Sequence, residues 1–424
     1  MKQRAVRGMT LMELMVASGI SVVLLAGAVV AGTSLQKRSV QEREVNDTQA
    51  LSRAVRDQLE VDLSSIGTAL GPSRVHVGNN DAGMPMFIYA INVQTNATPP
   101  PPPVTDGGTV FIGPSDRLNI FGGLAQGFSF PDGGASPSLL ILGDCSGSTN
   151  SGTFLTGGTT VCTLAQIPSG AQAALMNKRV LITSPQLGMG CLGTVTGFPT
   201  GKQISLSWGY SGQAFGNEPC NPGNSSHPFW NISSNPAPLL MPLVSTSYQI
   251  SWRTDAGSAP LPVLQYDSDG PLMPDSGWVD LSYDVEQMKV RLGLTDTSDS
   301  GVGLVYVGDF GGGADGGTPP QPPIDMMTTS QQQNLLNQLG GFQSRDDAGS
   351  GMPDLLQWAL MRRVRAIEVT LMLRSRRADK DQAQYVITTG NPVVDAQGHP
   401  MDGRKRRVIT FNVSPRSFSY GGAP

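Results

Sequence analysis

One feature limits what this chain can fold into more than any other: Met9–Gly32 is apolar over 24 residues and carries a single charge, Glu13. As an α-helix this run would be ~36 Å long at ~1.5 Å per residue, which is enough to cross a bilayer. The eight residues before it hold three basic side chains and no acid, a pattern that keeps the preceding segment on the cytoplasmic side. The sequence therefore predicts a single-pass membrane helix with the rest of the chain outside the cytoplasm.

A secretory signal and a plain signal anchor are two simpler interpretations of this run. A secretory signal has a shorter apolar core followed by a small-residue cleavage site, and this run is too long for that. A carboxylate in such a segment costs roughly 2.5–3.5 kcal/mol at the helix centre and less near the interface. The presence of Glu13 therefore indicates that this segment has a function beyond anchoring, although Glu13 alone does not exclude a plain signal anchor.

The apolar run continues into an amphipathic segment without a helix-breaking residue, because no proline occurs before Pro72. Apolar side chains recur there at helical spacing, with charged residues between them. The pattern predicts one helix from about Met9 to about Ile66, ~85–90 Å long at ~1.5 Å per residue. Its first half is apolar all round. Its second half has one face to bury, formed by Leu51, Val55, Leu59, Leu63 and Ile66.

The start of this helix resembles the processing site of type IV pilins and type II secretion pseudopilins. The segment Gly8–Val16 reads GMTLMELMV, and the family motif is a basic leader ending in Gly, a hydrophobic residue and Thr-Leu-x-Glu. The resemblance implies that a prepilin peptidase cuts after Gly8 and methylates the new amine of Met9. It also implies that Glu13 pairs with the N-terminal amine of a neighbouring subunit during assembly.

Beyond Gly71 the sequence alternates short β-branched or apolar runs with Gly, Pro, Asn, Asp and Ser, at spacings typical of antiparallel sheet. The expected fold is α+β: the long N-terminal helix packs on an antiparallel β-sheet head that carries a large loop-rich insertion. Strands are expected at Met86–Val93, Leu118–Phe121, Ser138–Leu142, Val180–Thr183, Ile204–Trp208, Tyr248–Trp252, Val279–Tyr283, Leu304–Val307, Val364–Leu373, Tyr385–Thr388 and Val408–Val413. The expected divisions are a leader at 1–8, the transmembrane or filament-core part of the helix at 9–32, its amphipathic part at 33–70, the insertion at 71–262 and the C-terminal β-rich head at 263–424.

Three stretches narrow the resemblance to PilW-type minor pilins. Asp280–Asp296 resembles that family's "V-E-x-(hydrophobic)-x-V" strand and turn, and Trp358–Arg376 resembles its Trp followed by a "V-R-A-V" strand. Asp57–Gly67 is similar to the family's "R-x-D-L-x-x-A-G" helix exit, whereas the centre, Asn79–Pro262, matches no pattern we can name.

The resemblance implies a structural subunit that helps to prime a type IV pilus at or near its tip. Its implied partners are other minor and major pilins, the prepilin peptidase, the inner-membrane assembly platform and a tip adhesin. Its implied location is the inner membrane before assembly and the pilus afterwards. A type II secretion pseudopilin and a membrane-anchored surface adhesin or binding protein are the alternatives.

Four cysteines lie in Gly/Ser/Thr/Asn-rich sequence within the insertion: Cys145, Cys162, Cys191 and Cys220. None forms a CxxC pair and the chain has only three histidines, so we expect no zinc or other metal site. Two disulfides are expected in an exported protein, and four buried free thiols are the alternative. Of the three possible connectivities, the pairing Cys145–Cys162 with Cys191–Cys220 closes the shortest loops and is favoured.

No motif for catalysis or cofactor binding is present. The sequence lacks a nucleophile elbow, an HExxH pair and a phosphate-binding loop, so we expect neither an enzyme nor a cofactor. Asp267-Ser-Asp269-Gly270 has the start of a calcium loop but not the rest of its spacing, and a turn is the simpler expectation.

The segment from Leu355 to Pro424 is basic, with twelve Arg and Lys against five acids in a chain of net charge −4. Such a segment could bind nucleic acid or anionic lipid. The basic residues of Arg362–Arg377 instead alternate with apolar ones, as in a half-buried strand. We therefore expect solvated flanks of a sheet that meets acidic neighbouring subunits, and no nucleic-acid partner.

The substitution Gly8→Arg is expected to leave a full-length, membrane-bound protein that does not assemble, because the peptidase loses its cleavage site. N-terminal sequencing of the membrane fraction measures this. A wild-type mature chain that began at Met1, or after Ala31, would contradict the prepilin interpretation.

Overall fold

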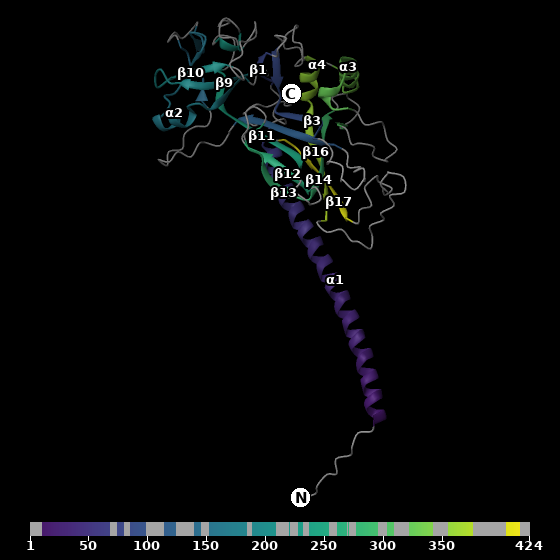
Figure 1. Ribbon diagram of the computed structural model, residues 1–424. Helices are drawn as coiled ribbons and strands as arrows, with labels where there is room; N and C mark the ends of the chain where they lie inside the picture. The colour runs from purple at the N-terminus through teal and green to yellow at the C-terminus, as the bar shows by residue number, and fades with distance from the viewer. Residues whose placement is uncertain are drawn as a thin grey trace.

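The protein is a long helix carrying a β-rich head, as the computed structural model in Figure 1 shows. The helix, α1 (Leu11–Ser64), has 54 residues and is continuous, which confirms the expected single helix. The structure describes residues 11–67, 74–79, 85–98, 114–123, 140–145, 152–184, 189–208, 220, 228–231, 237–253, 261–268, 270, 277–295, 303–308, 322–341, 355–375 and 404–415.

Two sheets form the head in the described part of the chain. The larger has thirteen strands, with the main order β13-β12-β11-β8-β9-β10-β7-β6, and the smaller has four, in the order β15-β14-β16-β17. The larger sheet contains β1 (Arg74–Asn79), β2 (Pro85–Ile88), β3 (Ile91–Thr98), β4 (Ser115–Gly123), β5 (Leu140–Ile141), β6 (Leu155–Thr156), β7 (Thr160–Cys162), β8 (Arg179–Ser184), β9 (Met189–Gly197), β10 (Gln203–Trp208), β11 (Leu239–Arg253), β12 (Leu261–Asp267) and β13 (Val279–Tyr283). The smaller contains β14 (Val285–Thr295), β15 (Leu304–Val307), β16 (Val364–Arg374) and β17 (Arg406–Val413).

The fold is α+β and dominated by sheet. Short helices α2 (Ser169–Leu175), α3 (Thr329–Gln338) and α4 (Leu355–Met361) and the 3-10 turns η1 (Pro228–Trp230) and η3 (Ile324–Met326) complete the described elements. Among the described strands, pairing is antiparallel except between β1 and β9, which run parallel. The all-antiparallel expectation therefore fails at that one pair.

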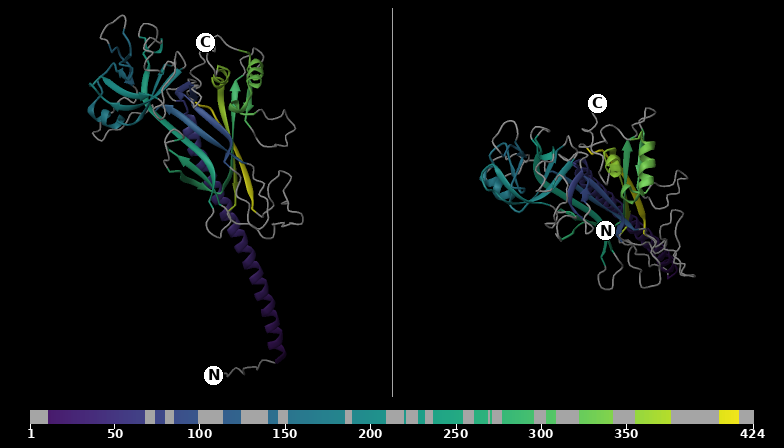
Figure 2. Two further views of the ribbon diagram at one scale, coloured as in Figure 1. Left: turned by 45° about the horizontal axis from the view of Figure 1, so that its top comes forward. Right: turned by 90° about the horizontal axis from the view of Figure 1, so that it is seen from above.

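The longest strand, β11, belongs to two cores. Its first residues, Leu239–Pro242, pair with β8, whereas its later residues, from Leu243 onward, pair with β4 and then β12. The lobe built on the first part stands to one side of the head in both views of Figure 2. We call this part, residues 140–240, the disulfide lobe. A strand shared between two cores holds the lobe and the head in a defined relation.

The disulfide lobe has its own hydrophobic core. Aromatic rings lie at its centre: Trp230 packs edge-on against Phe229 and Trp208, with ring centroids 4.6 and 5.4 Å apart. Around them pack aliphatic side chains from β7 to β10 and α2, including Val161, Leu175, Val180, Val195 and Ile204, all buried. This core accounts for the apolar content of a segment that is otherwise rich in Gly and Ser.

The second half of α1 is docked in the head core. Val55, Leu59, Leu63 and Ile66 are buried, and they share one cluster with Ile250 and Leu264 of the large sheet and with Val364–Leu373 of the small one. We call residues 51–66, the last part of α1 and the two residues after it, the docked half of α1. Fully burying such aliphatic side chains is worth roughly 1.5–3 kcal/mol each. The packing of this helix face against both sheets confirms the prediction that the amphipathic half of the helix packs on the head.

Strand positions match the sequence where alternation is strong. Val279–Tyr283 and Leu304–Val307 have the observed bounds of β13 and β15, whereas the expected strand at Tyr385–Thr388 lies outside the described residues. The Gly-rich strand β9 was not expected, because glycine is depleted in strands. The expected boundary between 262 and 263 falls inside β12, which pairs with β11, so the sheet continues across it.

Replacing Leu59 with Ala should lower the free energy of unfolding by about 2–5 kcal/mol, because it opens a cavity at a fully buried site. Val61, on the same helix, is 65% exposed, and Val61→Ala should change stability by no more than about 0.5 kcal/mol. Thermal or urea unfolding of the two full-length variants in detergent measures the difference. Equal stabilities would show that the helix stands free of the head.

Candidate functional site

The first half of α1 is the most exposed apolar surface of the described chain. Its large side chains are mostly more than half exposed: Leu11, Met12, Leu14, Met15, Val16, Ile20, Val22, Val23, Leu24, Leu25, Val29, Val30 and Leu35. We call residues 11–35 the apolar half of α1. The helix is long and apolar enough to cross a membrane, and none of its most apolar window is buried within the described structure. Monomeric soluble proteins rarely expose contiguous apolar patches of this extent.

Glu13 is the acidic residue in the first turn of α1, and its side chain is exposed. It lies at the far end of the helix from the head (Figure 1). Gly8 and Met9, the residues expected at the processing site, lie outside the described residues. The structure therefore places one carboxylate on the surface of the apolar half.

Polar contacts fix the docked half in place. The Tyr248 hydroxyl of β11 donates a hydrogen bond to the Asp62 carboxylate of α1, and burial together with that carboxylate raises the pKa of Tyr248 above its usual range. Arg56 pairs with Glu60 at 2.6 Å, and its guanidinium lies 5.9 Å from the Phe411 ring centre. The Tyr248–Asp62 hydrogen bond attaches the helix to β11, and the Arg56–Phe411 contact attaches it to the last described strand, β17.

The cysteines form the two disulfides Cys145–Cys162 and Cys191–Cys220, the sequential pairing favoured from the sequence. Each closes a short stretch of chain, with sequence separations of 17 and 29 residues. Cys191 and Cys220 are both buried in the lobe core. The disulfides lie in the lobe, at the opposite end of the molecule from Glu13 (Figure 1), so the candidate residues form no common site.

A buried ion triad joins three strands of the small sheet. Glu286 of β14 is fully buried and accepts hydrogen bonds from Arg406 of β17, with Nε–Oε2 at 2.7 Å and Nη2–Oε1 at 3.1 Å. Arg374 of β16 lies 3.5 Å from the same carboxylate. Charges taken out of water in this way need paired geometry to offset their desolvation. The triad therefore fixes the register of the C-terminal strand.

A second buried pair joins the two sheets. Lys289 of β14 lies 3.2 Å from Asp116 of β4 and donates to Asn96 at 2.9 Å. Asp116 also accepts the backbone N–H of Val290 at 3.0 Å. Burial raises the pKa of Asp116, while the Lys289 charge and these hydrogen bonds oppose that rise. The pair links the large sheet to the small one.

The expectation that the basic C-terminal residues are solvated is wrong for three of them. Arg363 and Arg374 are buried, and the side chain of Arg406 is only 7% exposed. Arg363 donates to the backbone carbonyls of Leu336 and Leu339 at the end of α3. A guanidinium favours the last carbonyls of a helix, where the helix dipole is negative. The sequence contains one sign that arginines are buried here: Glu286 is the only acid in its strand and needs a buried cation. Its arginine partners could not be identified from the sequence, because they lie up to 120 residues away.

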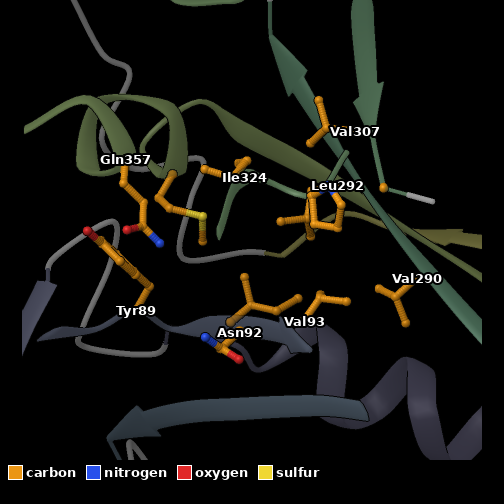
Figure 3. Close-up of a pocket in the computed structure, with 12 residues that line it drawn as sticks. Tyr89, Asn92, Val93, Val290, Leu292, Val307, Ile324 and Gln357 are labelled. Atoms are coloured by element: carbon orange, nitrogen blue, oxygen red, sulfur yellow. The ribbon is translucent and has the colours of Figure 1, made fainter. Parts of the chain in front are cut away.

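A small, partly open cavity lies between the two sheets (Figure 3). Its volume is about 20 Å³, and Val93, Val290, Leu292 and Ile324 form much of its wall. A water molecule needs at least ~10–15 Å³ on this measure, so the cavity has room for water and not for a ligand. Among the described residues, no three His, Cys, Asp or Glu side chains lie together as a metal site requires.

Comparison with known proteins adds no relative. No family model matches the chain, no characterised protein is similar to it in sequence, and no solved structure matches its fold. The exposed apolar half of α1 is therefore the feature on which a function can be argued.

Glu286→Gln is expected to lower the free energy of unfolding by about 3–5 kcal/mol, because Arg374 and Arg406 keep their charges without a buried counter-ion. The matched control is Glu368→Gln on β16, whose pair with Arg291 is partly exposed and is worth at most about 1 kcal/mol. Urea unfolding of both variants gives the comparison. Equal losses of stability in the two variants would show that the buried triad contributes no more than a partly exposed ion pair.

Proposed function

We propose that the protein is a minor pilin, a structural subunit that helps to prime a type IV pilus at or near its tip. The observation that carries the proposal is a single continuous helix with two environments. The docked half is buried in the head, while the apolar half is exposed on every side and bears Glu13. A helix of this kind is suited to pass from a bilayer into a bundle of similar helices.

The small residues of the apolar half support helix–helix packing. A Cβ added at Gly19, Gly27 or Gly32 would meet nothing within 4 Å, so these positions are open to a neighbour. Small residues let helix backbones approach closely in a membrane or a bundle. The proposed neighbours are the corresponding helices of other minor and major pilins.

In this proposal, Glu13 fixes the position of each helix along its neighbours. A carboxylate that moves into an apolar bundle needs a cation or hydrogen-bond donors, because an unpaired buried charge is strongly destabilising. The proposed partner is the N-terminal amine of an adjacent subunit after cleavage at Gly8. In this scheme the protein waits in the inner membrane with its head outside the cytoplasm, and an assembly platform then extracts it into the pilus.

The disulfide lobe favours a position at the tip over one in the shaft. It stands to one side of the head (Figure 2), and β11 joins it to the head without a break in the strand. We propose that the lobe faces a tip adhesin. The same lobe supports a second candidate, a membrane-anchored surface adhesin in which the lobe binds the target and no filament forms.

Glu13→Ala should leave membrane insertion intact, because it removes a charge from lipid. The variant should nevertheless be missing from sheared filaments, since the partner amine loses its anion. Glu42→Ala, an exposed glutamate farther along the same helix, is the matched control and should assemble normally. Immunoblots of membrane and sheared-pilus fractions measure both. Normal incorporation of Glu13→Ala would exclude the assembly role.

A further inference from the structure

We propose that Lys289 of β14 and Asn96 of β3 form an intramolecular isopeptide bond, with the Asp116 carboxyl of β4 carrying the proton between them. The bond would join the large sheet to the small one covalently. This inference goes beyond the proposed function and does not depend on it, because it concerns the interior of the head and holds whether or not the protein enters a filament.

Side chains from three strands meet at this junction of the two sheets. Lys289 Nζ lies 2.9 Å from Asn96 Oδ1 and 3.2 Å from Asp116 Oδ1. The amide carbon of Asn96 is one C=O bond, ~1.2 Å, from its oxygen, so the amine is close to the atom that it would attack. Reacting atoms about 3–3.5 Å apart are near an attacking geometry. β3 and β14 are neighbours here, since both contribute to the wall of the cavity in Figure 3.

A bulge in β3 turns the Asn96 side chain toward this junction. The pairing of β3 with β4 shifts register between Gln94 and Thr98, and Asn96 inside this bulge has a φ of 54°. Asn adopts left-handed backbone more readily than most other residues, and a bulge can re-aim a side chain. The Asn96 N–H donates to Asp116 Oδ1 at 3.1 Å. The bulge is therefore held on the carboxylate that would carry the proton.

Burial favours the uncharged forms that the reaction requires. The side chain of Lys289 is 7% exposed, and that of Asp116 is fully buried. Burial raises the pKa of Asp116, although the Lys289 charge opposes that rise. Because a low dielectric disfavours both charges, the pair can pass its proton from nitrogen to oxygen and become a neutral amine beside a neutral acid. A neutral amine is the form of lysine that acts as a nucleophile.

The reaction is a transamidation in which atoms and charge balance. Asp116 takes one proton from the Lys289 ammonium, and the neutral amine attacks Cγ of Asn96 to form a new C–N bond. The bond from Cγ to Nδ2 then breaks, and a second proton of the amine passes through Asp116 to the departing nitrogen. Ammonium leaves with the charge that Lys289 carried, and Asp116 ends as it began. Asn96 is exposed, which gives the leaving group a path to solvent.

A plain ion pair between Lys289 and Asp116 is the simpler account of the buried charges. It does not require an amide carbonyl on the same amine, which Asn96 supplies. The isopeptide bond would close a loop of 193 residues that contains the disulfide lobe. Because a cross-link restricts the unfolded chain, the bond would hold together the two sheets that enclose the docked half of α1.

Tryptic peptide mapping of the full-length protein, purified in detergent, tests the proposal. Without the bond, trypsin releases 75–117 and 254–289 as separate peptides, because basic residues bound both of them. With the bond, cleavage after Lys289 is blocked, and a branched peptide of 75–117 and 254–291 appears. Its mass should be lower than the sum of its two chains by one ammonia, and fragmentation spectra should place the link at Asn96 and Lys289.

Three variants assign the roles. Lys289→Arg keeps the buried positive charge without the nucleophile, and Asn96→Gly removes the electrophile while suiting the left-handed backbone. Asp116→Asn removes the proton carrier. All three should lose the branched peptide. Gln94→Ala, at an exposed amide two residues earlier on β3, is the matched control and should retain it.

If Asp116→Asn does not fold, Asn96→Gly still decides, because it leaves the pair of Lys289 with Asp116 in place. Complete cleavage of the wild-type protein after Lys289, with both peptides unmodified, would overturn the proposal. A branched peptide that persists in Asn96→Gly would also overturn it. So would a branched peptide that is lighter by one water and linked at Asp116, because the carboxyl would then be the electrophile.

Discussion

The docking of α1 into the head is the constraint on which the rest of the structure depends. Leu59, Leu63 and Ile66 are fully buried where the large and small sheets meet, so the helix supplies apolar surface that both sheets share. Because the same helix continues without a break into the apolar half, the orientation of the head relative to a membrane follows from this packing. In the proposed function, such a subunit exchanges lipid for neighbouring helices around the apolar half while its own core stays unchanged.

The head tolerates a large insertion because β11 is shared. Its 15 residues pair first with strands of the disulfide lobe and then with strands of the head, so the lobe needs no separate hinge. The lobe closes its own aromatic core around Trp230 and Phe229, and two disulfides restrict its unfolded chain. The docked half of α1 and the disulfide lobe can therefore be altered independently.

Buried charge is used where strands distant in sequence must pair correctly. Glu286 joins Arg374 and Arg406 across β14, β16 and β17, and Asp116 with Lys289 joins the two sheets. Apolar strands could slide by two residues and keep their alternation, whereas a displaced carboxylate would leave a charge unpaired. These pairs thus favour one register.

The sequence by itself determined the features that depend on near neighbours in the chain. The long helix followed from an uninterrupted apolar and amphipathic pattern, the bounds of β13 and β15 from alternation, and the disulfide pairing from the shortest loops. Only the tertiary structure decided which arginines are buried and how β11 serves two cores. The physical reason is that burial and pairing depend on contacts between segments more than 100 residues apart, such as Glu286 with Arg406, and local periodicity carries no information about which distant strand lies alongside.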